Sequence, residues 1–411
     1  MNLVYEYGTK KSTWNDRSVF LLFSTEVSYS KILTVLSLSM FCAMLGIGII
    51  APVLPLYAKR LGASGLAIGM IIGSFSFSRT GGMIVSGELA ERMNRKVLLL
   101  SGLAFYALAS VAYTFAATTE GLIAIRIGHG IGSAMVVPIT MAIGAEVAPK
   151  GKEGVFFGSL QGALFLGVGT GPLLSGLLAE TIGFNAPFYA MTALTVLSMV
   201  LVFRFLPGNL SSGRGSEAFC GLRSVFHGIL TDHEMLIVFF FQFCSAMSRG
   251  VLVMMIPLLA SEIRLSLSEI GFVVSLNSLS TGLLQRVSGR LADNLHKHRL
   301  ILVGGLISAV TLLGLPNLRT LLSLSIASVA FGVGHAFASP SLAAMAASRG
   351  KTYGSGRIMG LFNIAFSLGM TTGPVLVGML LDHTGKGIPF YFLSVMLLLA
   401  AYPFFSLKEA G

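Results

Sequence analysis

The chain has 411 residues, of which 54% are hydrophobic and only 11% charged, and its mean hydropathy is +0.83. Because soluble domains carry about 25% charged residues, this composition excludes a water-soluble globule and predicts a protein surrounded by lipid. The net charge of +11 is scattered between apolar runs instead of forming a basic stripe with stacking aromatics, so nucleic acid is not an expected partner. Three cysteines, Cys42, Cys220 and Cys244, lack the spacing of a disulfide framework or a metal site, and we expect neither a metal nor a cofactor.

Residues 1–30 are predicted to form a cytoplasmic N-terminal segment. They are mixed polar and basic, and their apolar run, residues 19–23, is too short to cross a bilayer. The pattern also differs from that of a cleavable signal peptide.

Twelve apolar runs follow that are long enough to cross a bilayer of about 30 Å, which takes about 20 helical residues. Their glycine-rich, non-alternating pattern is typical of helices and not of barrel strands. They lie at 32–57, 66–90, 97–117, 121–147, 154–181, 187–206, 235–260, 268–292, 299–316, 320–347, 355–382 and 388–407. The predicted fold class is an all-α membrane protein with twelve transmembrane helices.

Segments marked by proline or glycine recur along the chain at a constant spacing of 202 residues. The pairs are Pro55 with Pro257, residues 87–91 with residues 289–293, Pro138 with Pro340, and Gly171-Pro172 with Gly373-Pro374. A constant spacing over so much chain means that matching helices occupy matching places. We therefore predict two pseudo-symmetric six-helix bundles, at residues 31–206 and 234–411.

Residues 207–233 join the two bundles and are predicted to be a cytoplasmic linker. The linker begins with a flexible turn and then places five apolar residues on one helical face, which suits a short helix on the membrane surface. These residues are Leu222, Val225, Phe226, Ile229 and Leu230. A plain connection without further function is the alternative.

The distribution of basic residues predicts the orientation of the chain in a membrane. Of the 28 Lys and Arg residues, 19 fall in alternate loops and termini on one side, and only five fall on the other. The five are Lys59, Arg60, Arg264, Arg319 and Lys386. By the positive-inside rule, we predict a multi-pass protein of the inner or plasma cell membrane with both termini in the cytoplasm.

A loop signature between the second and third predicted spans resembles a known family. Residues 87–96, GELAERMNRK, are similar to the glycine, leucine, acid, arginine and basic-pair signature of the major facilitator superfamily, and the resemblance extends over essentially the whole chain. Glu91 stands where aspartate is usual and Asn94 where glycine is usual, and residues 289–299 are a weaker second copy that keeps Asp293.

The resemblance implies gating roles for this loop. Its candidate gating residues are Gly87, Glu91, Arg92, Arg95 and, in the second copy, Asp293. Glu91 would lie against the positive N-terminal end of the eleventh span, near residues 354–356, and Asp293 against that of the fifth, near residues 153–154, and together they would hold the outward-facing state. The alternative is that these charges only cap loops and set topology.

Two further segments carry the resemblance. Residues 126–134 in the fourth span are similar to the family's arginine and glutamine-glycine signature, with His129 in the glutamine's place. Residues 167–176 in the fifth span resemble the proline-glycine pattern of the twelve-span drug and metabolite antiporters that exchange substrate for protons. Gating candidates here are Gly167, Gly171 and Pro172, with Gly373 and Pro374 as their twins. Close helix packing alone would also explain such glycines.

If the halves pack as in this family, polar side chains converge on a central cavity. The candidate substrate-binding residues are Arg126, His129, Gln161, Gln242, Arg249, Asn277, His335 and Asn363. Each is alternatively a satisfied interhelical hydrogen bond. Because no Asp or Glu lies near the middle of a span, we expect an anionic, zwitterionic or neutral amphipathic substrate in preference to a simple cation. Arg79 and Arg286 are interpreted as gate residues that pair with Glu88, Glu91 or Asp293.

These features predict a secondary active transporter that works by alternating access, with proton-coupled efflux of small amphipathic molecules, as in multidrug antiporters. Candidates for proton coupling are His129 and His335, because imidazole titrates near neutral pH, and Glu146. Each histidine is alternatively a neutral ring bonded to a neighbouring carbonyl. The alternative function is import of an organic anion by symport or uniport. No phosphate-cradling loop, metal spacing or Ser-His-acid set suggests an enzyme. The expected partners are a small-molecule substrate, protons and lipid, and a monomer suffices.

Overall fold

Helices account for nearly all of the fold that the computed structural model describes, which covers residues 29–148, 153–208, 232–294, 296–349, 355–385 and 387–406. The long helices are α2 (Tyr29–Arg60), α3 (Gly65–Arg92), α4 (Arg95–Tyr113), α5 (Thr119–Val147), α6 (Glu153–Thr181), α7 (Ala186–Phe205), α9 (His233–Glu262), α10 (Leu267–Asn294), α11 (Lys297–Gly314), α12 (Leu321–Ser348), α14 (Ser355–Thr384) and α15 (Gly387–Ala401). The short elements η1 (Leu315–Asn317) and α16 (Pro403–Ser406) follow α11 and α15. The N-terminal segment 1–28 and the predicted surface helix of the linker lie outside the described residues.

Eleven helices within the described ranges are long and apolar enough to cross a membrane. The remaining long helix, α3, has lower hydropathy because Ser74, Ser76, Ser78, Arg79 and Thr80 occupy its middle. It packs between α5 and α14. The predicted all-α membrane fold with twelve spans is confirmed.

Polar side chains define where several of these helices begin. The hydroxyls of Ser64 and Thr118 accept hydrogen bonds from first-turn amides of α3 and α5, and the Asp232 carboxylate does so for α9. Thr320 and Ser323 form a reciprocal capping box at the start of α12. Such caps satisfy amide groups that have no partner within the helix, which matters where water is scarce.

The two predicted bundles comprise α2 to α7 and α9 to α16, and their helix crossings repeat at the spacing of 202 residues. A Cβ atom on Gly132 would lie 3.0 Å from the carbonyl oxygen of Gly102, where α5 crosses α4. The equivalent atom on Gly334 would lie 2.7 Å from that of Gly304, where α12 crosses α11. Backbones can approach this closely only because both partners are glycine. The pseudo-symmetric duplication is thereby confirmed contact by contact.

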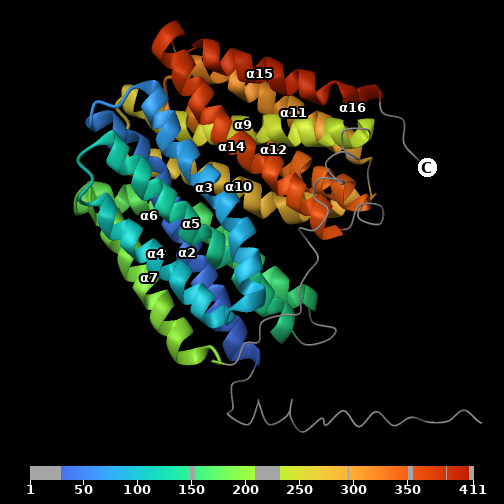
Figure 1. The fold of residues 1–411 in the computed structure, drawn as a ribbon. Helices are drawn as coiled ribbons and strands as arrows, with labels where there is room; N and C mark the ends of the chain where they lie inside the picture. Colours follow the sequence, from blue (N-terminus) through green and yellow to red (C-terminus); the bar gives the residue numbers. More distant parts are fainter. Residues whose placement is uncertain are drawn as a thin grey trace, which may run out of the picture.

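The two halves meet mainly through α3 against α14 and α6 against α10, and these pairs are close at only one end of the molecule. At what we call the closed end, a Cβ atom on Gly65 would lie 2.6 Å from the carbonyl oxygen of Gly378. At the opposite, open end, Gly158 and Gly162 of α6 and Gly360 of α14 have no atom of the described residues within 4 Å of that position. Figure 1 shows the blue-to-green half and the yellow-to-red half converging at one end and diverging at the other.

Candidate functional site

A central cavity of about 300 Å³ lies between the two halves. Its lining comes from α2, α3, α5 and α6 of the first half and from α9, α10 and α14 of the second, and most of it is apolar. The polar residues in the lining are Ser76, Arg79, Arg126, Arg249, Asn277, Ser278 and Ser367. None of the described lining residues carries a carboxylate, so the cavity is apolar with a positive charge.

Arg126 is fixed on the first-half wall of this cavity. It comes from α5 and is 7% exposed, and its Nε donates a hydrogen bond to the carbonyl oxygen of Ile71 on α3 at 3.2 Å. Its guanidinium carbon lies 4.3 Å from the centre of the Phe75 ring, a cation–π distance. The side chain thus bridges α5 and α3 at the cavity wall.

Two more arginines reach the same cavity from different helices. Arg79 projects from α3, and its Nε is buried without a hydrogen-bond partner among the described residues. Arg249 lines the cavity from α9, in the second half. The cavity therefore carries three guanidinium groups with no described acid against them, which costs free energy unless water or an anion is present.

His129 lies behind this wall and not on it. Its ring is fully buried, with the ring centre of Tyr106 at 4.4 Å and that of Phe75 at 5.1 Å. Its Nδ1 is 3.4 Å from the hydroxyl of Tyr113, while its Nε2 has no partner among the described residues. Phe75, which lines the cavity, contacts both His129 and Arg126.

The remaining predicted binding residues divide between positions on and off the cavity. Asn277 lines it, and its Nδ2 donates to the carbonyl oxygen of Ser328 on α12 at 3.1 Å. His335 is buried off the lining, with Nδ1 3.4 Å from the Ser245 hydroxyl. Gln242 is likewise buried off the lining.

Asn363 is not among the described residues that line the central cavity. The exposed Asn363 amide donates to the carbonyl oxygen of Met359 in its own helix at 3.0 Å. The Glu146 side chain lies outside the described residues. Of the eight predicted binding residues, the structure brings Arg126, Arg249 and Asn277 together.

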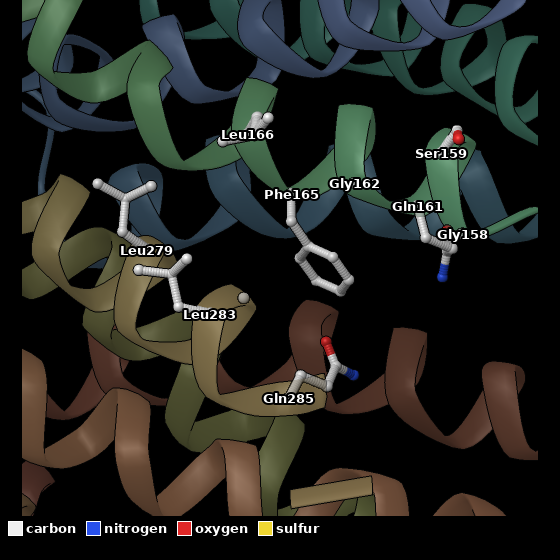
Figure 2. Close-up of a pocket in the computed structure, with 10 residues that line it drawn as sticks. Gly158, Ser159, Gln161, Gly162, Phe165, Leu166, Leu279, Leu283 and Gln285 are labelled. Carbon is white, nitrogen blue, oxygen red and sulfur yellow. The ribbon is translucent and has the colours of Figure 1, made fainter. Parts of the chain in front are cut away.

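Gln161 lies in a second, larger cavity of about 890 Å³ between α6 and α10 toward the open end. Figure 2 shows Gln161 and Phe165 projecting from α6 toward Leu283 and Gln285 of α10. This α6–α10 cavity is wide here because the two helices diverge from the closed end. It joins apolar walls to two side-chain amides, which suits passage of an amphipathic molecule.

The proline-glycine segments pack helices within each half and also across the halves, where Gly271 of α10 contacts Pro172 and Gly69 of α3 contacts Pro374. A Cβ atom on Gly171 would lie 2.6 Å from the carbonyl oxygen of Leu45, and one on Gly373 would lie 2.6 Å from that of Met247. Pro172 and Gly167 on α6 face α2 in the same way, and Pro374 on α14 faces Gly250 of α9. The helix-packing interpretation of these glycines has direct support.

The predicted gate at the open end is only partly visible. Arg92 is exposed, and the Nη1 of Arg95 lies 3.5 Å from the carbonyl oxygen of Ala142 on α5. The side chains of Glu91 and Asp293, the surroundings of Gly87, and the side chain of Arg286 lie outside the described residues.

The sequence interpretation missed Arg79 as a cavity residue and assigned it to a gate. The signal was present, since Arg79 is an arginine inside a span, the same feature that singled out Arg126 and Arg249. Nothing in the sequence distinguished Ser278 and Ser367, which also line the cavity, from the other serines of the spans.

Comparisons with known proteins agree along the chain. A family model described as Major Facilitator Superfamily matches residues 36–233 and 238–410. The chain is 30% identical to an uncharacterized MFS-type transporter of Methanocaldococcus jannaschii, over 85% of this chain and 91% of that protein. It is 28% identical to a multi-drug resistance efflux pump PmrA homolog of Lactococcus lactis, over 80% and 82%. The crystal structure of the nucleoside transporter NupG superposes with a TM-score of 0.79 at 12% identity, over 91% of this chain and 98% of that one.

Proposed function

We propose that this chain, which belongs to the major facilitator superfamily and is therefore a transporter and not an enzyme, exports small amphipathic molecules by alternating access. The observation that carries the proposal is the central cavity between the halves, which has apolar walls, three arginines and helices that pack closely at one end only. Rocking the halves about such a cavity would expose it to each side of the membrane in turn. The similarity to a PmrA efflux pump supports the export direction.

We place the protein in the cell membrane with both termini in the cytoplasm. The basic residues that bracket the open end, including Arg92, Arg95 and Lys297, belong to the positively charged side. The open end would then face the cytoplasm, and the structure would represent an inward-facing state. A single chain contains both halves of the cavity, so a monomer suffices.

Proton coupling is proposed to run through a buried histidine. His129 contacts Phe75 on the cavity wall, and its Nε2, which has no partner in the described part of the chain, would be available to a proton when the surroundings open. His335, held by Ser245, is the second candidate. Replacing each with glutamine removes the titrating group, and unchanged pH-driven transport in both variants would eliminate the histidine route.

The organic-anion importer remains the second candidate function, favoured by the three arginines. The direction of substrate transport distinguishes the exporter from the importer. Inside-out membrane vesicles with an acidic interior should accumulate a radiolabelled amphipathic substrate only when the protein is present, and collapse of the pH gradient should abolish accumulation. Accumulation instead in right-side-out vesicles with an acidic exterior would establish import and overturn export.

A further inference from the structure

The three cavity arginines identify the charge that a ligand must carry. Arg79, Arg126 and Arg249 come from α3, α5 and α9, so the positive charge is supplied by both halves. No described residue of the lining opposes it with a carboxylate, and the Arg79 Nε is buried without a partner. Guanidinium groups pair best with planar or tetrahedral oxyanions through charge-assisted hydrogen bonds.

We propose that the central cavity binds the oxyanion of an amphipathic organic anion, a carboxylate, sulfonate or phosphate monoester, and that Arg79 is one of the residues that hold it. The proposal rests on the proposed transport function and specifies its substrate class. The apolar body of the ligand would pack on the cavity wall that includes Met44, Leu252 and Met370. Since Arg249 belongs to the second half, the bound anion links the two halves.

A matched set of ligands tests the charge. Binding of 2-naphthylacetate, its neutral amide and a naphthyl trimethylammonium of similar size would be measured by thermal stabilisation of the protein in lipid nanodiscs. We expect the carboxylate to bind at least tenfold more tightly than the other two. Arg79→Gln should weaken its binding about tenfold, because each tenfold corresponds to about 1.4 kcal/mol, within the range of a charged hydrogen bond. The exposed Arg319→Gln is the control and should bind like the wild type.

Equal or tighter binding of the cation or the amide, or an unaltered affinity in Arg79→Gln, would overturn the anion proposal. Export of the cation or amide by wild-type vesicles would leave the transport function standing and remove only the anion preference. Absence of transport for all three ligands, with the carboxylate still bound, would overturn the proposed function and leave the site.

A different contact, at the closed end, carries a second proposal. Asp382 near the end of α14 accepts hydrogen bonds from the backbone amides of Gly65 and Leu66, at 2.7 and 2.9 Å, in the first turn of α3. Glu180 near the end of α6 accepts one from the amide of Ser268, at 2.8 Å, in the first turn of α10. Glu180 and Asp382 are 202 residues apart, as are Leu66 and Ser268. The same contact therefore occurs in both copies of the repeat.

Each contact joins a carboxylate of one half to the N-terminus of a helix in the other half. The first-turn amides of a helix have no partner within it, and the helix N-terminus carries partial positive charge. A carboxylate supplies both the acceptor and the opposite charge. Opening the closed end would separate α3 from α14 and α6 from α10, so both contacts would have to break.

We infer that Glu180 and Asp382 form a pair of latches that stabilise the state closed at this end. The loop acids Glu91 and Asp293 are predicted to play the mirror role for the same two helix pairs at the open end. There the acids lie in the last turns of α3 and α10, and the helix N-termini are those of α14 and α6. The two sets would hold opposite states of the transport cycle.

Distances between spin labels across the closed end test the latches. Labels would be placed at Glu120→Cys and Arg319→Cys, both exposed, in a background whose native cysteines are replaced by serine. With both latches intact, the distance between the two labels should be mainly the short one, which corresponds to the closed end. Glu180→Gln and Asp382→Asn should each raise the ratio of long to short distances about fivefold, in line with the strength of a helix cap, and together more.

Glu234→Gln is the control, because the Glu234 carboxylate accepts a hydrogen bond from Arg349 within its own half and away from the closed end. Its distance distribution should equal that of the wild type. Unchanged distances in the double variant, with helix content retained by circular dichroism, would overturn the latch. If the double variant does not fold, the conservative Glu180→Asp variant must still shift the ratio, since its shorter side chain withdraws the acceptor; no shift there also overturns the proposal.

Discussion

The two halves share their packing contacts but not the residues that face the cavity. A Cβ atom on Gly130 would lie 2.5 Å from the carbonyl oxygen of Phe75, and one on Gly332 would lie 2.7 Å from that of Asn277. Those four residues form two pairs related by the spacing of 202 residues. The backbone crossing is thus the same in both halves, although the side chains at the crossing are an aromatic ring in one and an amide in the other.

Positions on and behind the cavity wall diverge further. Ser328 stands in the second half where Arg126 stands in the first, and Phe331 where His129 stands. Even the bridge between the paired helices is built in opposite directions: Arg126 of α5 donates to α3, whereas Asn277 of α10 donates to Ser328 of α12. The helix crossings are therefore alike in both halves, whereas the residues on and behind the cavity wall differ between them. Substitutions at mirrored positions can test that division.

The largest effect is expected where the halves are most alike. Gly171→Val and Gly373→Val would each drive a side chain into a backbone carbonyl 2.6 Å from the Cβ position. Overpacking a tight site costs about 1–3 kcal/mol or more, so both variants should lose most of their folded protein, and by similar amounts. Thermal unfolding of purified protein measures the loss. Gly158→Val is the control, since nothing lies within 4 Å of its Cβ position; a large difference between the two mirrored variants would contradict the equivalence.

A smaller effect, confined to transport, is expected where the halves differ. Arg126→Gln removes a charged donor from the cavity and should raise the substrate concentration for half-maximal uptake by roughly 10-fold, the equivalent of about 1.4 kcal/mol. Ser328→Ala at the mirrored position should change it less than about twofold, because Asn277 bonds the Ser328 backbone and not its side chain. Uptake into inside-out vesicles over a range of substrate concentrations gives both values. Equal effects would mean that the cavity is functionally symmetric.

The same division explains what could be predicted from the sequence. The spacing of 202 residues and the long apolar runs yielded the fold, and predicted span ends lie within a few residues of the helices, as for 299–316 against α11. The site was predicted only in part. Arg126 and Arg249 were predicted because a charged side chain inside a span is costly unless it faces protein or water.

Which residues of one helix face meet the cavity was not readable from the chain. Gln242 and Arg249 are seven residues apart and share a face of α9, yet only Arg249 lines the cavity. His335 lies off the lining, and the sequence could not show this because α12 packs on four long helices, α9, α10, α11 and α14. The inter-half carboxylates Glu180 and Asp382 were passed over because they lie at span ends, where acids are ordinary.

The smallest effect concerns a single hydroxyl that differs in role between the halves. Ser86 of α3 donates to the carbonyl oxygen of Ala134 on α5 at 2.8 Å, whereas the mirrored Ser288 of α10 donates to Leu284 of its own helix at 2.8 Å. An interhelical hydrogen bond in a membrane protein contributes about 0.6 kcal/mol on average, so Ser86→Ala should lower the free energy of unfolding by about that amount. Ser288→Ala should leave it nearly unchanged, because a bond within one helix does not hold two helices together. Equilibrium unfolding in mixed micelles of increasing dodecyl sulfate content measures both variants under the same conditions. Equal losses would show that the hydroxyls act through local packing, and the asymmetry between the halves would then be restricted to the residues that line the cavity.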